Sequence, residues 1–174
     1  MKKAKVPVLH ELAKLVLTFM PDKVSEILRN RYPTWKTFRE WEVVGTFPEF
    51  PLSESWMKAD RRKIFADTAW LMRRKNKKGK TVFRYIVHEI KTGKFDFEQE
   101  VKLYQVSAIK RSCVCGSTHL YFWIPEKFME FCSTNDKEIN LLIRLGFVRI
   151  VKLDYLMPLI KELVEEAERQ IEAF

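Results

Sequence analysis

Residues 81–93 read TVFRYIVHEIKTG, and this stretch decides the fold. Its alternating positions are largely apolar on both sides of an extended chain: Phe83, Tyr85 and Val87 on one side, and Ile86 and Ile90 on the other. Such a pattern predicts a central strand that is covered on both faces of its sheet. Glu89 and Lys91 at its end are charged, which is out of character for a buried strand and points to function.

A second strand is predicted directly upstream, over residues 62–72. The two runs are separated by residues 73–80, RRKNKKGK, a polar segment that contains a glycine. Two apolar runs around a polar turn are typical of a β-hairpin. We therefore expect residues 62–72 and 81–90 to pair as antiparallel neighbours.

The remaining apolar patterns place helices and strands around this hairpin. We expect helices over residues 9–20, 22–31, 96–110 and 136–145, a final helix capped by Asp154, and strands over residues 37–47, 120–124 and 147–151. Asp22, which follows Met20-Pro21, is the expected N-cap of the second helix. This order predicts an α/β protein with a mixed central sheet flanked by helices.

Length and composition narrow the class of protein. The chain has 174 residues, of which 47% are hydrophobic and 13% aromatic, so residues 1–174 are expected to form a single domain. The formal net charge of +9 attracts polyanions, and nucleic acid is a stronger candidate than an anionic membrane or an acidic protein. The five glycines form neither a dinucleotide-binding loop nor a Walker loop.

Cellular location is also suggested by composition. No apolar run approaches the roughly 20 residues that span a bilayer. Three cysteines are too few for a disulfide framework. We therefore expect an intracellular, cytoplasmic protein with no membrane partner, and the scarcity of Gln and Asn beside many charged residues leans towards a thermophile.

Three charged residues of the hairpin carry the chemical argument. Glu89 and Lys91 stand two positions apart on a strand, so they project from the same face, and Asp67 on the partner strand can stand opposite them. Two carboxylates that converge in a partly buried place repel each other unless a cation or a proton intervenes. Magnesium prefers oxygen ligands, and a divalent ion held by carboxylates both stabilises phosphoryl charge and generates hydroxide. The three residues therefore predict a Mg²⁺ or Mn²⁺ site that hydrolyses phosphodiesters.

Asp67, a hairpin turn and then Glu89-Ile90-Lys91 resemble the D-x(n)-(D/E)-x-K signature of the PD-(D/E)XK nuclease superfamily. The order of elements from Asp22 to Pro125 is also similar to that family's α-β-β-β-α-β core, which leaves a helix, a strand and a helix as a C-terminal extension. The resemblance implies a restriction-endonuclease-like fold and a metal-dependent nuclease, with DNA favoured over RNA as the substrate. It further implies that Asp67 and Glu89 hold the ion and that Lys91 orients or activates water.

Residues 86–93, followed by a helix that contains Tyr104, are most similar to the RecB-type branch of that superfamily. In that branch a glutamine precedes the tyrosine by four positions. Glu100 occupies that position here, and Gln99 is its neighbour. The resemblance implies catalytic contacts from Gln99 and Tyr104, although Gln99 and Glu100 are evenly balanced between a catalytic and a structural role.

The superfamily often has a further metal ligand, a glutamate on its first core helix. Glu26 is the first choice for this position in the present sequence. Glu11 and Glu42 are its competitors.

Each site residue also has a structural interpretation. Asp67 can be a solvent-facing strand residue, and Glu89 with Lys91 can be a surface ion pair of little energetic value. For Tyr104, a place in the core is favoured over a catalytic contact. His88 neighbours Glu89 but points to the opposite face, which predicts a structural role.

Positive charge is concentrated around the hairpin. Residues 58–80 contain ten Lys or Arg against two Asp, whereas the last 23 residues are net acidic. A basic segment next to Asp67 is what phosphate contacts require, and the alternative is a merely solvated turn. The residues expected to contact nucleic acid are Arg61, Arg62, Arg73, Arg74, Lys75, Lys77, Lys78 and Lys94.

Two further patterns leave their role open. A zinc site of three cysteines and one histidine is one interpretation, and thiols at the ends of elements the other, for Cys113, Cys115, His119 and Cys132. The final helix carries an apolar stripe that either packs on the sheet or serves as a homodimer contact, made of Leu156, Ile160, Leu163, Ala167 and Ile171.

The sequence thus favours one function and keeps a second. The first is a divalent-metal-dependent nuclease in which the basic hairpin holds the nucleic-acid backbone. The alternative is a catalytically inactive nucleic-acid-binding module, or a subunit of a larger complex, on the same fold.

Overall fold

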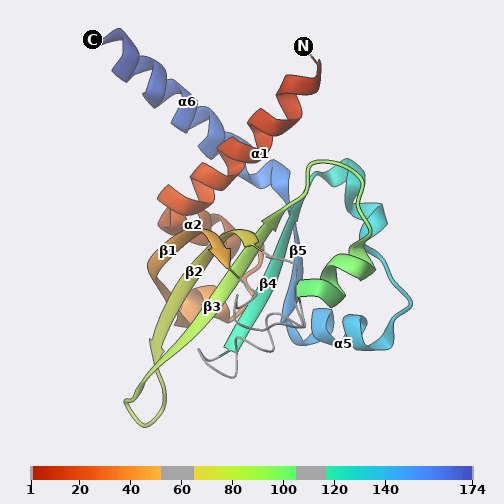
Figure 1. The fold of residues 1–174 in the computed structure, drawn as a ribbon. Coiled ribbons are helices and arrows are strands. Elements are labelled where there is room, and N and C mark those ends of the chain that lie inside the picture. The colour runs from red at the N-terminus through yellow and green to blue at the C-terminus, as the bar shows by residue number, and fades with distance from the viewer. Residues whose placement is uncertain (1, 52–64, 105–116, 174) are drawn as a thin grey trace.

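Five strands form one mixed sheet in the computed structural model, which describes residues 2–51, 65–104 and 117–173 (Figure 1). The strands lie side by side in chain order: β1 (Glu42–Pro51), β2 (Phe65–Lys75), β3 (Thr81–Ile90), β4 (Ser117–Ile124) and β5 (Val148–Lys152). The pairs β1–β2 and β2–β3 are antiparallel, whereas β3–β4 and β4–β5 are parallel. The predicted α/β class with a mixed central sheet is confirmed.

Helices cover both faces of this sheet. The α1 face, as we call it, is covered by α1 (Lys2–Phe19), α2 (Pro21–Arg31), α3 (Thr37–Glu40), the 3-10 helix η2 (Leu153–Leu156) and the start of α6 (Met157–Glu172). The opposite α5 face is covered by the helical segment 97–104, the 3-10 helix η1 (Glu126–Cys132) and α5 (Lys137–Leu145). None of the helices in the described part of the chain is long and apolar enough to cross a bilayer.

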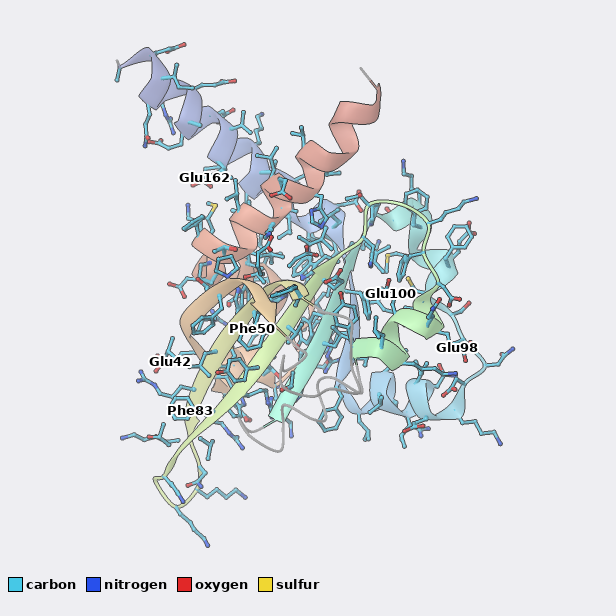
Figure 2. The ribbon with its side chains drawn as sticks, in the orientation of Figure 1. Glu42, Phe50, Phe83, Glu98, Glu100 and Glu162 are labelled. Atoms are coloured by element: carbon cyan, nitrogen blue, oxygen red, sulfur yellow. The ribbon has the colours of Figure 1, made fainter. Side chains whose placement is uncertain are left out.

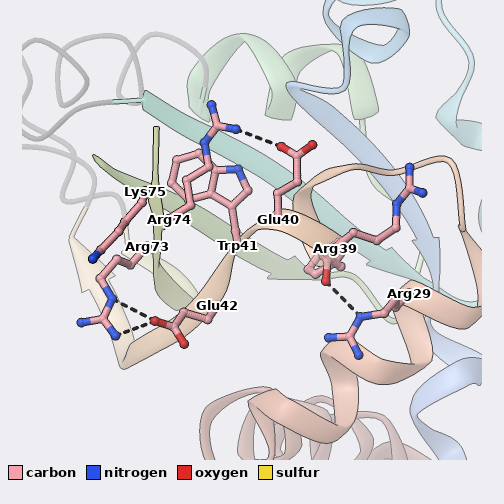
Figure 3. Close-up of a pocket in the computed structure, with 9 residues that line it drawn as sticks. Arg29, Arg39, Glu40, Trp41, Glu42, Arg73, Arg74 and Lys75 are labelled. Carbon is pink, nitrogen blue, oxygen red and sulfur yellow. Dashed lines mark hydrogen bonds and ion pairs between the residues drawn. The ribbon is translucent and has the colours of Figure 1, made fainter. Parts of the chain in front are cut away.

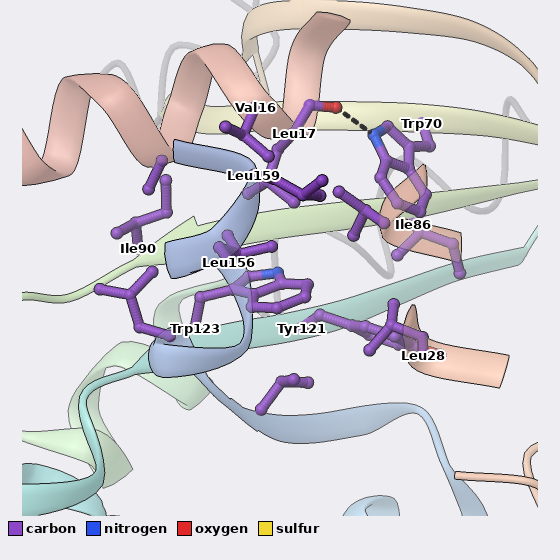
Figure 4. Close-up of a cluster of buried hydrophobic side chains, with 14 of the residues drawn as sticks. Val16, Leu17, Leu28, Trp70, Ile86, Ile90, Tyr121, Trp123, Leu156 and Leu159 are labelled. Carbon is purple, nitrogen blue, oxygen red and sulfur yellow. Dashed lines mark hydrogen bonds between the residues drawn. The ribbon is translucent and has the colours of Figure 1, made fainter. Parts of the chain in front are cut away.

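The alternation of side chains along β2, β3 and β4 divides the core into two layers. Trp70, Ile86 and Trp123 are buried against α1, α2 and α6, and the Trp70 indole Nε1 donates a hydrogen bond of 2.7 Å to the Leu17 carbonyl (Figure 4). Val87 and its neighbours on the α5 face pack against the helical segment 97–104. Burial on both faces explains why both alternating sets of β3 are largely apolar, and residues 86–90 are buried at every position.

The predicted hairpin is confirmed, and β3 has the expected bounds. Thr68 pairs with His88 at one end of the ladder and Lys75 with Thr81 at the other. In the turn, the Asn76 side-chain oxygen accepts hydrogen bonds from the backbone N–H groups of Lys78 and Lys80, each 2.9 Å long. Gly79 has a φ of 77°, a conformation that glycine adopts without a steric penalty.

The expected strand over residues 37–47 is wrong in its first part. Residues Thr37–Glu40 form the short helix α3, and β1 begins only at Glu42. The strand then continues through Pro48 to Pro51, past the expected end at residue 47. Because β1 is an edge strand of the sheet, Pro48 has a free side on which its missing N–H costs no ladder hydrogen bond.

Two of the expected helix caps are also wrong. Pro21 is the first residue of α2 and Met20 is its N-cap, so Asp22 lies in the first turn. Proline suits this position because its missing N–H would be unpaired in any case. Asp154 lies in η2, and its carboxylate accepts a hydrogen bond of 2.9 Å from the Glu126 N–H instead of capping α6.

The helix expected over residues 136–145 is confirmed, and both of its ends have a clear cause. The Asp136 carboxylate accepts a 3.0 Å hydrogen bond from the Ile139 N–H, as an N-cap does. Gly146 ends the helix with a φ of 83°. Of the predicted apolar stripe, Leu156 of η2 and Ile160 of α6 are buried, but Ile171 is 74% exposed, since the second half of α6 extends away from the sheet (Figure 1).

Candidate active site

The ends of β2 and β3 opposite the hairpin turn bring the predicted acidic residues together. The recorded ladder stops at the pair Thr68–His88, and one more step of the same register sets Asp67 opposite Glu89. There the Asp67 Oδ2 accepts a hydrogen bond of 2.8 Å from the backbone N–H of Ile90. The side chain of Asp67 thus holds the end of β3 where the backbone ladder ends.

Glu89 is a nearly buried carboxylate, with 7% of its surface exposed. Burial raises its pKa to about 7, and the negative charge of Asp67 adds to this effect. Lys91 and the hydroxyl of Tyr104 lower the pKa, but they do not outweigh the burial. Within the described part of the chain, the Glu89 Oε2 atom has no hydrogen-bond partner. A cation placed here would be stabilised by a carboxylate that has few other contacts.

Lys91 follows the last residue of β3 and faces two carboxylates. Its Nζ lies 3.5 Å from the Glu89 Oε1 and 3.1 Å from the Glu100 Oε1. Its backbone N–H donates to the Trp123 carbonyl at 3.0 Å, which fixes the start of this side chain to β4. Burial by itself would lower the pKa of Lys91, but the two carboxylates raise it above its ordinary value. Lys91 is therefore a protonated hydrogen-bond donor near neutral pH.

The helical segment 97–104 supplies the remaining side chains of the site. Asp96 caps it, since its carboxylate accepts a 3.1 Å hydrogen bond from the Gln99 N–H. This start places Glu100 towards Lys91, whereas the side chain of Gln99 is exposed. Tyr104 is buried in the core of the α5 face, as its structural interpretation expects, and it also contacts Glu89; its catalytic role stays a prediction. The expected continuation of the helix to residue 110 lies outside the described residues.

His10 on α1 is a further residue of the candidate site, and the sequence did not suggest it. Its Nε2 lies 3.0 Å from the Asp67 Oδ1, and its Nδ1 lies 3.5 Å from the Glu11 Oε1. The hydrogen bond to Asp67 raises the pKa of His10, against the effect of its partial burial. No spacing rule links His10 to Asp67, because 57 residues separate them and only the packing of α1 brings them together.

The glutamates that we considered as a further metal ligand do not join this site. Glu26 is exposed on α2, and Val24, Ser25 and Leu28 are the residues by which that helix packs. Glu11 reaches the site only through His10. Glu42 lies beside the hairpin, away from Glu100, and pairs with Arg73 at 2.5 Å (Figure 2).

The donor set for a metal consists of Asp67 and Glu89. Across residues 2–51, 65–104 and 117–173, no group of three or more His, Cys, Asp or Glu side chains is arranged to hold an ion. Magnesium is commonly bound by one or two carboxylates together with waters and substrate phosphates. The chemistry of this pair, and the unpartnered Oε2 of Glu89, therefore fit Mg²⁺ or Mn²⁺ better than an ion that needs a complete protein cage.

Most of the predicted basic residues lie at the other end of the hairpin. Eight residues of extended chain separate Asp67 from Lys75, which corresponds to roughly 26 Å. Lys94 alone of the described candidates lies in the loop that follows β3, where its Nζ is 5.4 Å from the Phe131 ring. Arg61 and Arg62 lie outside the described residues. The expectation that the basic hairpin adjoins Asp67 is thus wrong for residues 73–78, because an antiparallel hairpin sends its turn away from its open end.

A zinc site made of all four predicted residues is excluded, because His119 and Cys132 lie on opposite faces of the sheet. His119 points to the α1 face, where its Nδ1 lies 3.1 Å from the Gly146 carbonyl oxygen. Cys132 is buried on the α5 face. One ion cannot bind side chains on opposite faces of the sheet, so a site that contains both is excluded. Cys113 and Cys115 lie outside the described residues.

His88 has the structural role that its face predicted. It is fully buried on the α1 face, and its Nδ1 accepts a 2.9 Å hydrogen bond from the Trp123 indole. Burial lowers its pKa to about 3, which keeps the imidazole neutral.

A scan against protein-family models, a search of the curated proteins and a search of the solved structures each found no match to this chain.

Proposed function

We propose that this protein is a divalent-metal-dependent nuclease of the PD-(D/E)XK kind, with DNA as the favoured substrate. One observation carries the proposal. The carboxylate of Glu89 is nearly buried beside Asp67, its pKa is raised to about 7, and its Oε2 has no hydrogen-bond partner in the described part of the chain. Carboxylates in such surroundings are characteristic of functional sites, since burial and a like charge are costly without a cation.

The arrangement of elements supports the same proposal. Three antiparallel strands are followed by the helical segment 97–104, and the chain then returns to β4, which is parallel to β3. This order agrees with the restriction-endonuclease-like αβββαβ core that the signature implied. The candidate site lies where β2 begins and β3 ends, which is the place that the signature implies for Asp67, Glu89 and Lys91.

Asp67 and Glu89 would hold the ion, which when bound supplies a Lewis acid for the phosphoryl oxygens and lowers the pKa of water. Lys91 stays protonated, so it acts as a donor that orients water or a phosphate oxygen rather than as a general base. Glu100 keeps the Lys91 ammonium on this face of the sheet. Tyr104 positions Glu89.

The test is cleavage of labelled single- and double-stranded DNA and RNA with Mg²⁺, with Mn²⁺ and in EDTA. The nuclease proposal expects cutting that requires the ion and that Asp67→Asn and Lys91→Gln each abolish. Glu26→Gln is the matched control, because this exposed glutamate of α2 lies outside the site. Cutting that persists in Asp67→Asn or in Lys91→Gln would contradict the assignment.

A second function is favoured by one specific observation. Both carboxylate oxygens of Asp67 already have partners, His10 on Oδ1 and the Ile90 N–H on Oδ2. In a nucleic-acid-binding module without catalysis, Asp67 would be retained because it links α1 to the end of β3. Salt-sensitive binding of DNA or RNA without metal-dependent cutting would select this alternative.

A further inference from the structure

A pocket on the α1 face gathers cationic side chains far from Asp67 and Glu89. Its volume is about 470 Å³, and four of the residues that line it are Lys36, Arg74, Arg84 and Arg149. These residues come from the segment before α3 and from β2, β3 and β5. Within the lining, Glu40 is the one carboxylate, and it is paired with Arg74 at 2.9 Å.

The charges that line this pocket are mostly positive. Burial lowers the pKa of Arg84, and the positive charge of Arg74 lowers it further, whereas Tyr121 and Glu40 raise it. Burial also lowers the pKa of His119 to about 4, with Arg84 and Arg149 contributing. Like charges thus repel one another around a shared space, and a bound anion would relieve that repulsion.

Aromatic rings hold the guanidinium groups in place. Arg84 lies 4.3 Å and Arg74 5.0 Å from the centroid of the Trp41 ring, and Arg149 lies 4.0 Å from that of Trp35. The other face of Trp35 is covered by Tyr32, stacked at 3.8 Å. Because the faces of Trp35 are taken and Trp41 is buried, these rings offer no platform on which a base can stack.

The pocket continues into the basic hairpin. A neighbouring pocket of about 550 Å³ contains Arg73, Arg74 and Lys75 beside Trp41 (Figure 3). Arg74 also borders the space formed by Lys77 and Lys78 in the turn. Arg74 is common to the three pockets, so cationic side chains extend from Lys36 and Arg149 to the tip of the hairpin, with Glu40 and Glu42 paired to Arg74 and Arg73 between them.

We propose that the pocket formed by Lys36, Arg74, Arg84 and Arg149 binds backbone phosphates of a nucleic-acid strand, independently of the base sequence. A planar guanidinium carries several N–H donors that match phosphate oxygens, so Arg74 and Arg84 can bind phosphate beside the bonds they already make to Glu40 and Thr37. Contacts to phosphate oxygens carry no sequence information, which is the reason to expect no preference for particular bases. The inference rests on the proposed function for the class of its ligand, and it adds a second contact region on the other face of the sheet.

The test is fluorescence anisotropy in EDTA, with a labelled thymidine homopolymer, a mixed-sequence strand and a duplex, over a series of salt concentrations. The pocket variant is Lys36→Gln combined with Arg149→Gln. The control is Lys127→Gln combined with Lys161→Gln, which removes the same charge from η1 and α6, outside the pocket. The salt slope is the dependence of the logarithm of affinity on the logarithm of salt concentration. Each phosphate contact contributes about 0.9 to this slope on a duplex and about 0.7 on a single strand, which corresponds to roughly five- to eightfold in affinity at about 0.1 M salt. The pocket variant should therefore lose two such contributions on every sequence, and the control should lose neither.

Since Arg149 packs on Trp35, Lys36→Gln alone is the second variant. Lys36 is exposed, and its loss should lower the slope by one contact without affecting thermal unfolding. Equal binding by the pocket variant and its control would overturn the inference, as would binding to anionic lipid vesicles but to none of the oligonucleotides. These binding measurements contain no metal, so they do not depend on catalysis. If the protein fails to cut nucleic acid in the separate cleavage assay, the nuclease proposal is refuted and the binding result still stands.

Discussion

Replacing Glu89 by Gln should stabilise the protein at neutral and higher pH, and the size of the effect can be worked from the site. The folded carboxyl has a pKa of about 7 against an ordinary value of 4.5. At roughly 1.4 kcal/mol for each pH unit, this difference corresponds to about 3 kcal/mol. Because the folded state holds its proton more tightly, the free energy of unfolding of the wild type falls as the pH rises from 4.5 to 7. Glutamine carries no charge and avoids this loss.

The assay is urea-induced unfolding in EDTA at a series of pH values from below 4.5 to above 7. Glu89→Gln and the wild type should be equally stable at the acidic end and should differ by about 3 kcal/mol at the other. His10 also makes stability depend on pH, because its raised pKa stabilises the fold below its ordinary value of 6.5, a contribution lost as the pH rises through the folded pKa. This contribution is present in both proteins and largely cancels in their difference.

Glu26→Gln is the matched control for this measurement, since the same chemical change is made at an exposed position. Its unfolding free energy should stay within about 0.5 kcal/mol of the wild type at every pH. Mg²⁺ should stabilise the wild type above pH 7 but not Glu89→Gln, because the ion compensates the buried charge. Parallel stability curves for Glu89→Gln and the wild type over this whole range would refute the reasoning about Glu89.

Three further outcomes are expected. In calorimetry, Mn²⁺ should bind the wild type more weakly as the pH falls, because the His10 imidazolium then competes for Asp67 and Glu89 takes up a proton; His10→Gln should remove the first contribution and leave the second. Trp70→Phe should lower the free energy of unfolding by about 3 kcal/mol in urea, since the Leu17 carbonyl loses its buried donor and a cavity replaces part of the indole. Asp136→Ala should cost about 1 kcal/mol in the same assay through loss of the α5 N-cap, and Asp136→Asn should restore most of it.

Much of the candidate site could be predicted because its residues follow local rules. Glu89 and Lys91 are two positions apart on a strand whose apolar pattern is unmistakable, and a hairpin fixes which residue of the preceding strand stands opposite them. Tyr104 follows from helical spacing after Asp96. The choice between Gln99 and Glu100 could not be made, since it depends on where the helix begins relative to the sheet.

His10, by contrast, has no pattern around it that points to chemistry. Its contact with Asp67 arises because α1 packs across the end of β2. On the same face, the Trp70 indole donates a hydrogen bond to the Leu17 carbonyl. The pocket around Arg74 and Arg149 is equally invisible in the sequence. Its cations come from β2, β3, β5 and the segment before α3, so no window of the sequence contains them together.

The sequence by itself determined the class of the fold, the hairpin and the three residues Asp67, Glu89 and Lys91, because strand alternation and turn composition act over a few neighbouring residues. Only the tertiary structure decided which helix meets Asp67, that Glu89 is buried enough to hold a proton near pH 7, and that the basic turn lies roughly 26 Å from the acidic pair. The reason is physical. Burial and long-range charge depend on how the two core layers pack against the sheet, and that packing is a property of the whole chain.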